Sequence, residues 1–247
     1  AQGVVYLELR STPRAICPGS SIDEYVNTVL SEFVRFEKEC RQRTDAEFEL
    51  SQRLKQEHEN KLATNGGESK PHTEVEFTPK SLSMIPRLLL SFDRSKSKEE
   101  AMQTAALAIK LFRSGNPYIV GVDLGGNPTR GNFADFEEPL QLCRDEGLKV
   151  SVHCGEIPCA VNSSSPTDKL NVDVTTGNPP SARMLAAALE AERIIEFRPD
   201  RLGHALFLPL SATKKLEADP IPIECCPTSN VMTLNLAGVH GGSLMKG

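Results

Sequence analysis

Six short apolar runs that end in polar residues recur along this chain, and helix-like stretches separate most of them. The runs are Val4–Arg10, Arg87–Arg94, Tyr118–Gly126, Lys149–Glu156, Arg201–Leu206 and Ile221–Cys226. Repeated alternation of strand and helix is typical of parallel strands joined by helical crossovers. A chain of 247 residues, of which 39% are hydrophobic, can bury the core of such a domain. We therefore expect one α/β domain, in the size range of a barrel.

The connections between these runs are of two kinds. Three of them carry apolar residues at three- and four-residue spacing and are predicted to be helices: Lys98–Arg113, Phe133–Glu146 and Ser181–Phe197. Glu37–Asn60 is charge-rich and predicts an elongated surface helix, followed by a mobile loop. We expect a single domain over residues 1–247, with excursions at about 42–78 and 159–180.

The alternation of side chains within the runs predicts where a site would lie. In the first run, aliphatic side chains share one face and Tyr6, Glu8 and Arg10 share the other. Because helices flank the strands, the polar face should point into the interior. Polar residues of the same parity in later runs are Ser91, Asp93, Asp123, Ser151 and His153. Several of them gather at carboxyl strand ends, where barrel enzymes build their sites, so the pattern favours an enzyme.

Composition excludes several partners. The formal net charge is −5 and no Lys/Arg-rich block occurs, which argues against binding a nucleic acid polymer or an anionic membrane. No apolar stretch approaches the length of a membrane span. Seven scattered cysteines without a C-x-x-C pair indicate reduced thiols. We expect a cytoplasmic monomer whose partner is a small molecule, and the absence of an initial Met suggests a piece of a longer product.

Two strand ends combine residues that can perform chemistry. The run ending His153-Cys154-Gly155-Glu156 places an imidazole at a strand end and a carboxyl group three residues later. Arg201-Leu202-Gly203-His204 places a second imidazole at the end of a later strand. Alone, the first motif is equally compatible with a structural histidine, and the second favours a structural histidine.

Taken together and in this order, the two motifs resemble the H-x-G-E and R-[IL]-G-H strands of the adenosine deaminase family. Gly121–Asn127 is similar to the family's G-[IV]-D-L-x-G-[DN] strand, and Cys226–Asn230 to its C-[PL]-T-S-N turn. Tyr6–Arg14 resembles the branch that acts on N6-methyl-AMP. The resemblance implies a (β/α)8 TIM barrel of the metal-dependent hydrolase type, of which about six of eight strands are present.

The resemblance also implies roles for individual residues. His153 would bind Zn²⁺, Glu156 would donate a proton to purine N1, and His204 would orient and help to deprotonate the attacking water. Zinc can lower the pKa of its bound water to about 7, which supplies hydroxide near neutrality. A partly desolvated pocket favours the protonated form of a carboxyl group that acts as an acid.

Other positions would contact the substrate. The residues implied are Ser11, Thr12, Pro13, Arg14, Asp93 and Gly126, the first four through the nucleotide phosphate. The alternatives stay open: a proline-containing strand exit with a solvated Arg14, a partner or helix cap for Asp93, and a plain turn glycine at Gly126. Asp123 is expected to be structural, and Cys154 and Cys225 are expected to be core thiols.

The chain departs from the family at both ends. The family's first strand carries H-x-H and its last carries paired aspartates, and neither motif occurs here. The remaining histidines are His58, His72 and His240, in polar or Gly-rich segments. Because most zinc ligands are missing, we expect this chain alone to be inert. The resemblance implies that the complete protein converts N6-methyl-AMP to IMP. Two alternatives remain: deamination of adenosine or AMP, and a non-catalytic barrel fragment that binds a nucleotide or partner without metal.

Overall fold

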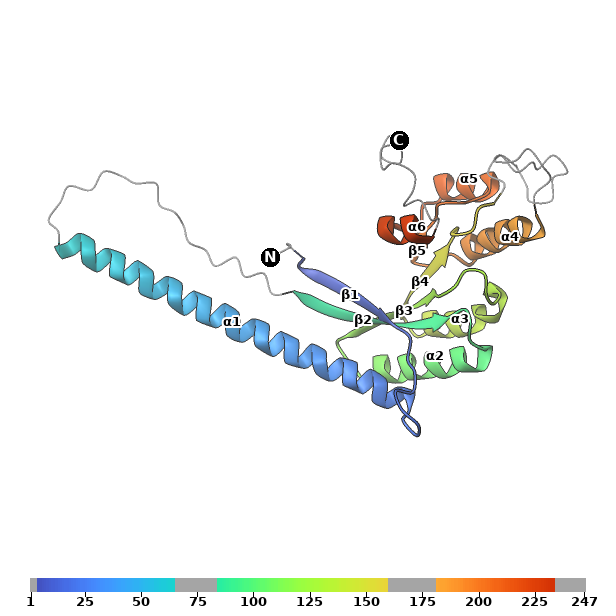
Figure 1. Cartoon of the computed structure of the whole chain (residues 1–247). Helices are drawn as coiled ribbons and strands as arrows, with labels where there is room; N and C mark the ends of the chain where they lie inside the picture. Colours follow the sequence, from blue (N-terminus) through green and yellow to red (C-terminus); the bar gives the residue numbers. More distant parts are fainter. Residues whose placement is uncertain (1–3, 65–83, 160–180, 234–247) are drawn as a thin grey trace. The chain divides into compact units, whose positions relative to one another are not determined.

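The computed structural model describes residues 4–64, 84–159 and 181–233. Six strands are present: β1 (Tyr6–Ser11), β2 (Ile85–Asp93), β3 (Ile119–Gly125), β4 (Lys149–Cys154), β5 (Arg201–His204) and β6 (Ile223–Glu224). The helices are α1 (Ile22–Thr64), α2 (Lys98–Arg113), the short 3-10 helix η1 (Phe133–Asp135), α3 (Glu137–Asp145), α4 (Ala182–Phe197), α5 (Leu210–Ala218) and α6 (Pro227–Thr233). Figure 1 shows these elements in chain order.

The strands form one sheet in the order β1-β2-β3-β4-β5-β6, and the pairs from β2 to β6 are parallel. Helices connect the successive parallel strands from β2 to β6. This arrangement confirms the predicted α/β class and the match to part of a TIM barrel. Parallel pairing also brings the carboxyl ends of neighbouring strands to one edge of the sheet.

The chain divides into two compact units. The first comprises residues 1–9 and 14–87, and the second comprises residues 10–13 and 88–247. The two strand-end histidines and Glu156 all belong to the second unit. The single domain expected over 1–247 stays a prediction.

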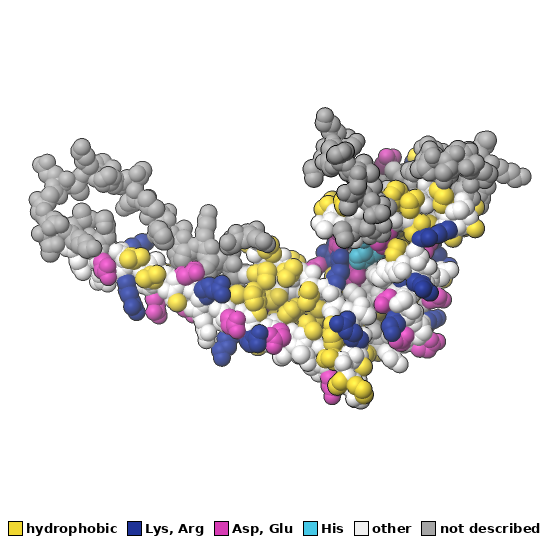
Figure 2. Space-filling view, viewed as in Figure 1, with side chains coloured by type: hydrophobic (Ala, Val, Ile, Leu, Met, Phe, Trp, Pro, Cys, Tyr) yellow, Lys and Arg dark blue, Asp and Glu magenta, His cyan; other side chains and the backbone are white. Residues whose placement is uncertain are grey.

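Helix α1 dominates the first unit. It spans 43 residues, and at its start Ser21 and Glu24 each accept a hydrogen bond from the other's backbone N–H, at 3.2 and 2.9 Å. Val26 and Leu30 are buried, whereas Val34 and Phe48 farther along the helix are 55% and 51% exposed. Figure 2 shows hydrophobic and charged side chains together on this side of the first unit. The elongated helix is present, but the boundary expected at residue 42 lies inside it because the helix begins at Ile22.

The core of the second unit lies between the sheet and its helices. Leu88, Leu90, Val122, Leu124 and Val152 are fully buried. Helices α2, α3 and α4 contribute further apolar side chains, among them Ala105, Leu140 and Ile194. The apolar faces of β2, β3 and β4 therefore point toward helices, as their alternation predicts.

The same agreement does not extend to β1. Leu7 and Leu9 remain 40% and 41% exposed, so the aliphatic face predicted to lie under helices is not covered by the described residues. The expected excursion at 159–180 lies outside the described residues except for Cys159. Within the part of the chain that is described, no helix combines the length and the apolar character needed to cross a membrane.

Candidate active site at the ends of β4 and β5

His153 and His204 lie side by side because β4 and β5 are parallel neighbours. The register pairs His153 with Gly203 and Cys154 with His204, and the two imidazole centroids are 5.2 Å apart. A Cβ atom at position 203 would lie only 3.0 Å from His153 Cδ2. A side chain at position 203 would therefore move the imidazole of His153 by a few tenths of an ångström.

The Nδ1 atom of His153 faces two oxygen acceptors. It lies 3.0 Å from the carbonyl oxygen of Leu124, in hydrogen-bonding geometry, and 3.3 Å from Asp123 Oδ1, a charge contact. Burial opposes the charged imidazole, but the carboxylate of Asp123 outweighs it and raises the pKa of His153. Two acceptors at Nδ1 favour a proton there, which leaves Nε2 of the neutral ring with the lone pair that a metal ligand requires.

Asp123 connects His153 to a polar network in the sheet interior. Ser91 Oγ donates to Asp123 Oδ2 at 3.3 Å, and Arg10 Nε lies 3.4 Å from Asp123 Oδ1. Arg10 also forms an ion pair with Glu224, whose Oε1 lies 3.0 Å from Arg201 Nε. The polar face predicted from alternation is thus interior at these positions. Asp123 is 2% exposed and has the contacts of the structural residue that was expected.

Glu156 and His204 face each other beside this network. Glu156 Oε2 lies 3.4 Å from His204 Nε2, and the side chains are 11% and 5% exposed. On the other side of the ring, His204 Nδ1 lies 2.6 Å from Asn230 Oδ1. The structure therefore brings together Glu156, His204 and His153, the three residues assigned to chemistry.

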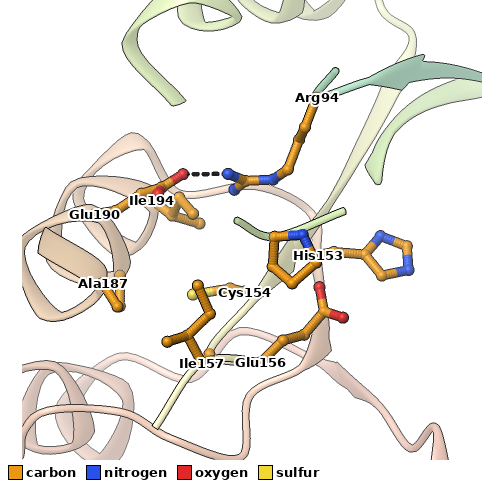
Figure 3. A pocket seen from close by; sticks show the side chains of 11 residues that line it. Arg94, His153, Cys154, Glu156, Ile157, Ala187, Glu190 and Ile194 are labelled. Carbon is orange, nitrogen blue, oxygen red and sulfur yellow. Dashed lines mark hydrogen bonds and ion pairs between the residues drawn. The ribbon is translucent and has the colours of Figure 1, made fainter. Parts of the chain in front are cut away.

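A small pocket opens next to Glu156 and His153, with a volume of about 30 Å³. Its opposite wall is formed by α4, where Glu190 accepts from the buried Arg94 at 2.5 Å (Figure 3). Cys154 lines the same pocket, and burial raises the pKa of its thiol to about 12. Cys154 is therefore an inert core thiol, as expected. The same expectation for Cys225 is wrong, because Cys225 is exposed next to β6, the last strand of the described sheet.

Asp93 and Gly126 have local partners. Asp93 Oδ1 accepts from both the backbone N–H and the hydroxyl of Ser95, each at 2.8 Å. Gly126 adopts φ +99°, and a Cβ atom there would lie 2.7 Å from Asp93 Oδ1. The close approach and the positive φ both require glycine. These contacts account for the two residues as parts of a turn, and their substrate contacts stay predictions.

The predicted phosphate-binding turn is split between the two units. Ser11 ends β1, Thr12 is half-buried and Pro13 is buried, all in the second unit. Arg14 belongs to the first unit, where its guanidinium lies 5.3 Å from the ring centroid of Tyr25. Arg14 is exposed, as the solvated arginine considered from the sequence would be, and a phosphate role for the four residues stays a prediction.

Among residues 4–64, 84–159 and 181–233, no group of three or more His, Cys, Asp and Glu side chains could hold a metal ion. His72 and His240, and the side chain of His58, lie outside what the structure describes. The described residues therefore do not make a complete metal site, and His153 as a zinc ligand stays a prediction.

Sequence reasoning missed Asn230, Glu224 and the Arg94–Glu190 pair. Asn230 was noted only as part of a turn motif, and the other contacts join segments far apart in the chain. Alternation of side chains had already placed Arg10 on the interior face, but no local pattern identifies its partner.

No family model matches the chain. It is 30% identical over 239 residues to "N6-mAMP deaminase" of Arabidopsis thaliana, a match that covers 96% of this chain and 53% of the relative. It is 34% identical over 149 residues to "Adenosine deaminase-like protein" of Drosophila pseudoobscura pseudoobscura, which covers 60% of this chain and 36% of the relative.

Solved structures of N6-mAMP deaminase and ADAL proteins also match the chain. The crystal structure of the Arabidopsis N6-mAMP deaminase MAPDA matches with a TM-score of 0.58 and 29% identity, over 96% of this chain and 51% of that one. The Arabidopsis ADAL structure complexed with IMP matches with a TM-score of 0.58 and covers 94% of this chain and 49% of that one. The chain thus spans about half the length of these relatives. It is a homologue of the N6-methyl-AMP deaminases and adenosine deaminase-like proteins.

Proposed function

We propose that this chain carries part of the active site of a hydrolase that converts N6-methyl-AMP and water to IMP and methylamine. The observation that carries the proposal is the contact of Glu156 with His204 beside His153, at the ends of neighbouring strands. Polar groups at the carboxyl ends of parallel strands are where barrel enzymes perform chemistry. Relatives named N6-methyl-AMP deaminase, and a homologous structure complexed with IMP, support this substrate class.

In this proposal Glu156 and His204 divide the proton transfers. His204 accepts a proton from the water that attacks purine C6, through Nε2. Glu156 donates a proton to purine N1, so that the ring takes up the electron pair that the attack displaces. Both side chains are almost fully buried, and a group of this kind contributes roughly 10²- to 10⁴-fold to a rate.

We also propose Zn²⁺ as the cofactor, with Nε2 of His153 as one of its ligands. A bound zinc ion would supply an acidified water near neutral pH. The described residues do not complete its coordination, so the remaining ligands are expected from the rest of the protein. Without them, the 247-residue chain is expected to be inactive.

The proposed site also includes residues that bind the substrate. Ser11, Thr12, Pro13 and Arg14 are proposed to meet the phosphate of a nucleotide, which distinguishes N6-methyl-AMP or AMP from adenosine. Asp93 and Gly126 are proposed to border the purine.

We also propose that the protein is a cytoplasmic monomer. All seven cysteines are free, which supports a reducing compartment.

Turnover by the protein encoded in the complete transcript tests the function. The protein would be expressed with zinc and incubated separately with N6-methyl-AMP, AMP and adenosine, and the products would be separated chromatographically. We expect IMP and methylamine from N6-methyl-AMP, at a higher kcat/KM than for the other two. Preferred conversion of adenosine would overturn the phosphate assignment. A folded, zinc-loaded protein without turnover of any of the three would leave a nucleotide- or partner-binding barrel as the function.

A further inference from the structure

The amide of Asn230 closes a chain of contacts that runs through His204 to Glu156. His204 Nδ1 lies 2.6 Å from Asn230 Oδ1, and His204 Nε2 lies 3.4 Å from Glu156 Oε2. Asn230 lies in α6, and its backbone N–H donates to the carbonyl oxygen of Cys226 at 2.9 Å. The contact at Nδ1 therefore bears on which nitrogen of His204 carries the proton, and so on whether Nε2 can accept one.

A neutral imidazole has one nitrogen that donates and one that accepts. With Asn230 Oδ1 as acceptor, the proton lies on Nδ1 and the lone pair lies on Nε2, toward Glu156. Without an acceptor at Nδ1, the proton could move to Nε2, where it would face Glu156. An Nε2 that already carries a proton cannot accept one from water.

The backbone at His204 is also unusual. His204 has φ +63° and Ala205 has φ +50°, in the left-handed region that few non-glycine residues occupy. The N–H of Ala205 lies 2.9 Å from both the Cys154 and the Gly203 carbonyl oxygens, which fixes this turn against β4. Strained backbone of this kind persists only where surrounding contacts over-determine it. The contact with Asn230 extends this fixation from the backbone to the imidazole.

We propose that Asn230 is a positioning residue that holds His204 in the Nδ1–H tautomer and orients its Nε2 toward Glu156 and the reacting water. Its structural part rests on the contact between His204 Nδ1 and Asn230 Oδ1, whereas its catalytic consequence rests on the proposed function. Asn230 itself touches neither Glu156 nor His153 in any contact that the described residues show.

The tautomer of His204 can be measured on the chain as it is, without nucleotide or metal. Long-range ¹H–¹⁵N correlation spectra at about pH 8.5, where ordinary imidazoles are neutral, distinguish the two tautomers. The signals of His204 would be assigned by their loss in His204→Gln. We expect the Nδ1–H pattern. An Nε2–H pattern, or a mixture of both, would overturn the proposal.

Substitutions at position 230 separate positioning from packing. Asn230→Leu removes the acceptor at similar volume and should shift His204 toward Nε2–H, whereas Asn230→Asp keeps an acceptor and should retain Nδ1–H. The exposed neighbour Ser229 provides the control, and Ser229→Ala should leave the spectrum unchanged. An unchanged tautomer in Asn230→Leu would overturn the proposal. If Asn230→Leu does not fold, the unsubstituted chain and Asn230→Asp decide the question, because both must show Nδ1–H.

The same substitutions in the complete protein test the catalytic consequence. Loss of a group that orients a site residue typically costs about 10- to 100-fold. We expect kcat to fall by that amount in Asn230→Leu with KM nearly unchanged, and to recover in part in Asn230→Asp. Equal kcat in all three proteins would contradict the catalytic part. A held tautomer in a protein without deaminase activity would instead contradict the proposed function and leave the positioning intact.

Discussion

Gly203 has no side chain and so leaves room for the imidazole of His153 on the neighbouring strand. The sequence motifs around positions 153 and 203 predicted two histidines at strand ends. The distance between the two imidazoles could not be predicted, because it depends on the register that pairs His153 with Gly203 across two strands. The contact of Asn230 with His204 could not be predicted for a similar reason, because it joins residues of α6 and β5 that are 26 positions apart in the chain.

Gly203→Ala should displace the imidazole of His153. The added Cβ would lie 3.0 Å from Cδ2 and 3.1 Å from Cγ, so the ring must shift, and overpacking of this kind costs about 1–3 kcal/mol of unfolding free energy. Urea unfolding and the NMR signals of His153 would measure both effects. Gly115→Ala is the control for the NMR signals of His153 alone, because a Cβ there meets nothing within 4 Å although its positive φ is itself strained. Unmoved His153 signals in Gly203→Ala would contradict the packing argument.

At the scale of elements, local patterns predicted most boundaries well. Helix α2 begins and ends where its apolar spacing predicted, and Ser97 and Glu100 form a capping box at its start. The helix expected over Phe133–Glu146 instead divides into η1 and α3. Pro139 in the first turn of α3 has no N–H to continue a helix from η1. Strand β5 is shorter than predicted because the positive φ of His204 and Ala205 ends it.

The start of β4 depends on Asp200 in a way that pH should show. Burial opposes the charge of Asp200, but hydrogen bonds from Lys149 Nζ and the Val150 N–H outweigh it and lower the pKa of Asp200. A lowered folded-state pKa contributes stability above the unfolded-state pKa of about 3.9, which is lost as pH falls through the folded-state value.

Asp200→Asn should therefore reduce the unfolding free energy near pH 7 and have a shrinking effect below about pH 4, where the carboxylate of the unsubstituted protein is protonated. The asparagine can still accept from Val150, so the difference reports the charge. Urea midpoints at a series of pH values would measure it. The partial exposure of this ion pair makes the effect small. A difference that stays constant from pH 7 to pH 3 would contradict it.

At the scale of the whole molecule, the sequence predicted the fold class and the homologous proteins because strand alternation and several short motifs agree with one another. It did not predict the division into two compact units or the full extent of α1, since neither depends on a local pattern. The chain matches about half of its relatives' length, and the described residues do not make a complete metal site. We propose that this chain contributes the acid, the base and one metal ligand of the active site.

The most direct test of the proposed site is the kcat of Glu156→Gln in the protein encoded by the complete transcript. Glutamine preserves the volume of the side chain but cannot donate the proton to purine N1. With N6-methyl-AMP as substrate, we predict a loss of roughly 10²-fold or more, whereas Glu217→Gln on the exposed surface of α5 should leave kcat unchanged. A Glu156→Gln protein that keeps the unsubstituted kcat would contradict the assignment of the acid and, with it, the site proposed at the ends of β4 and β5.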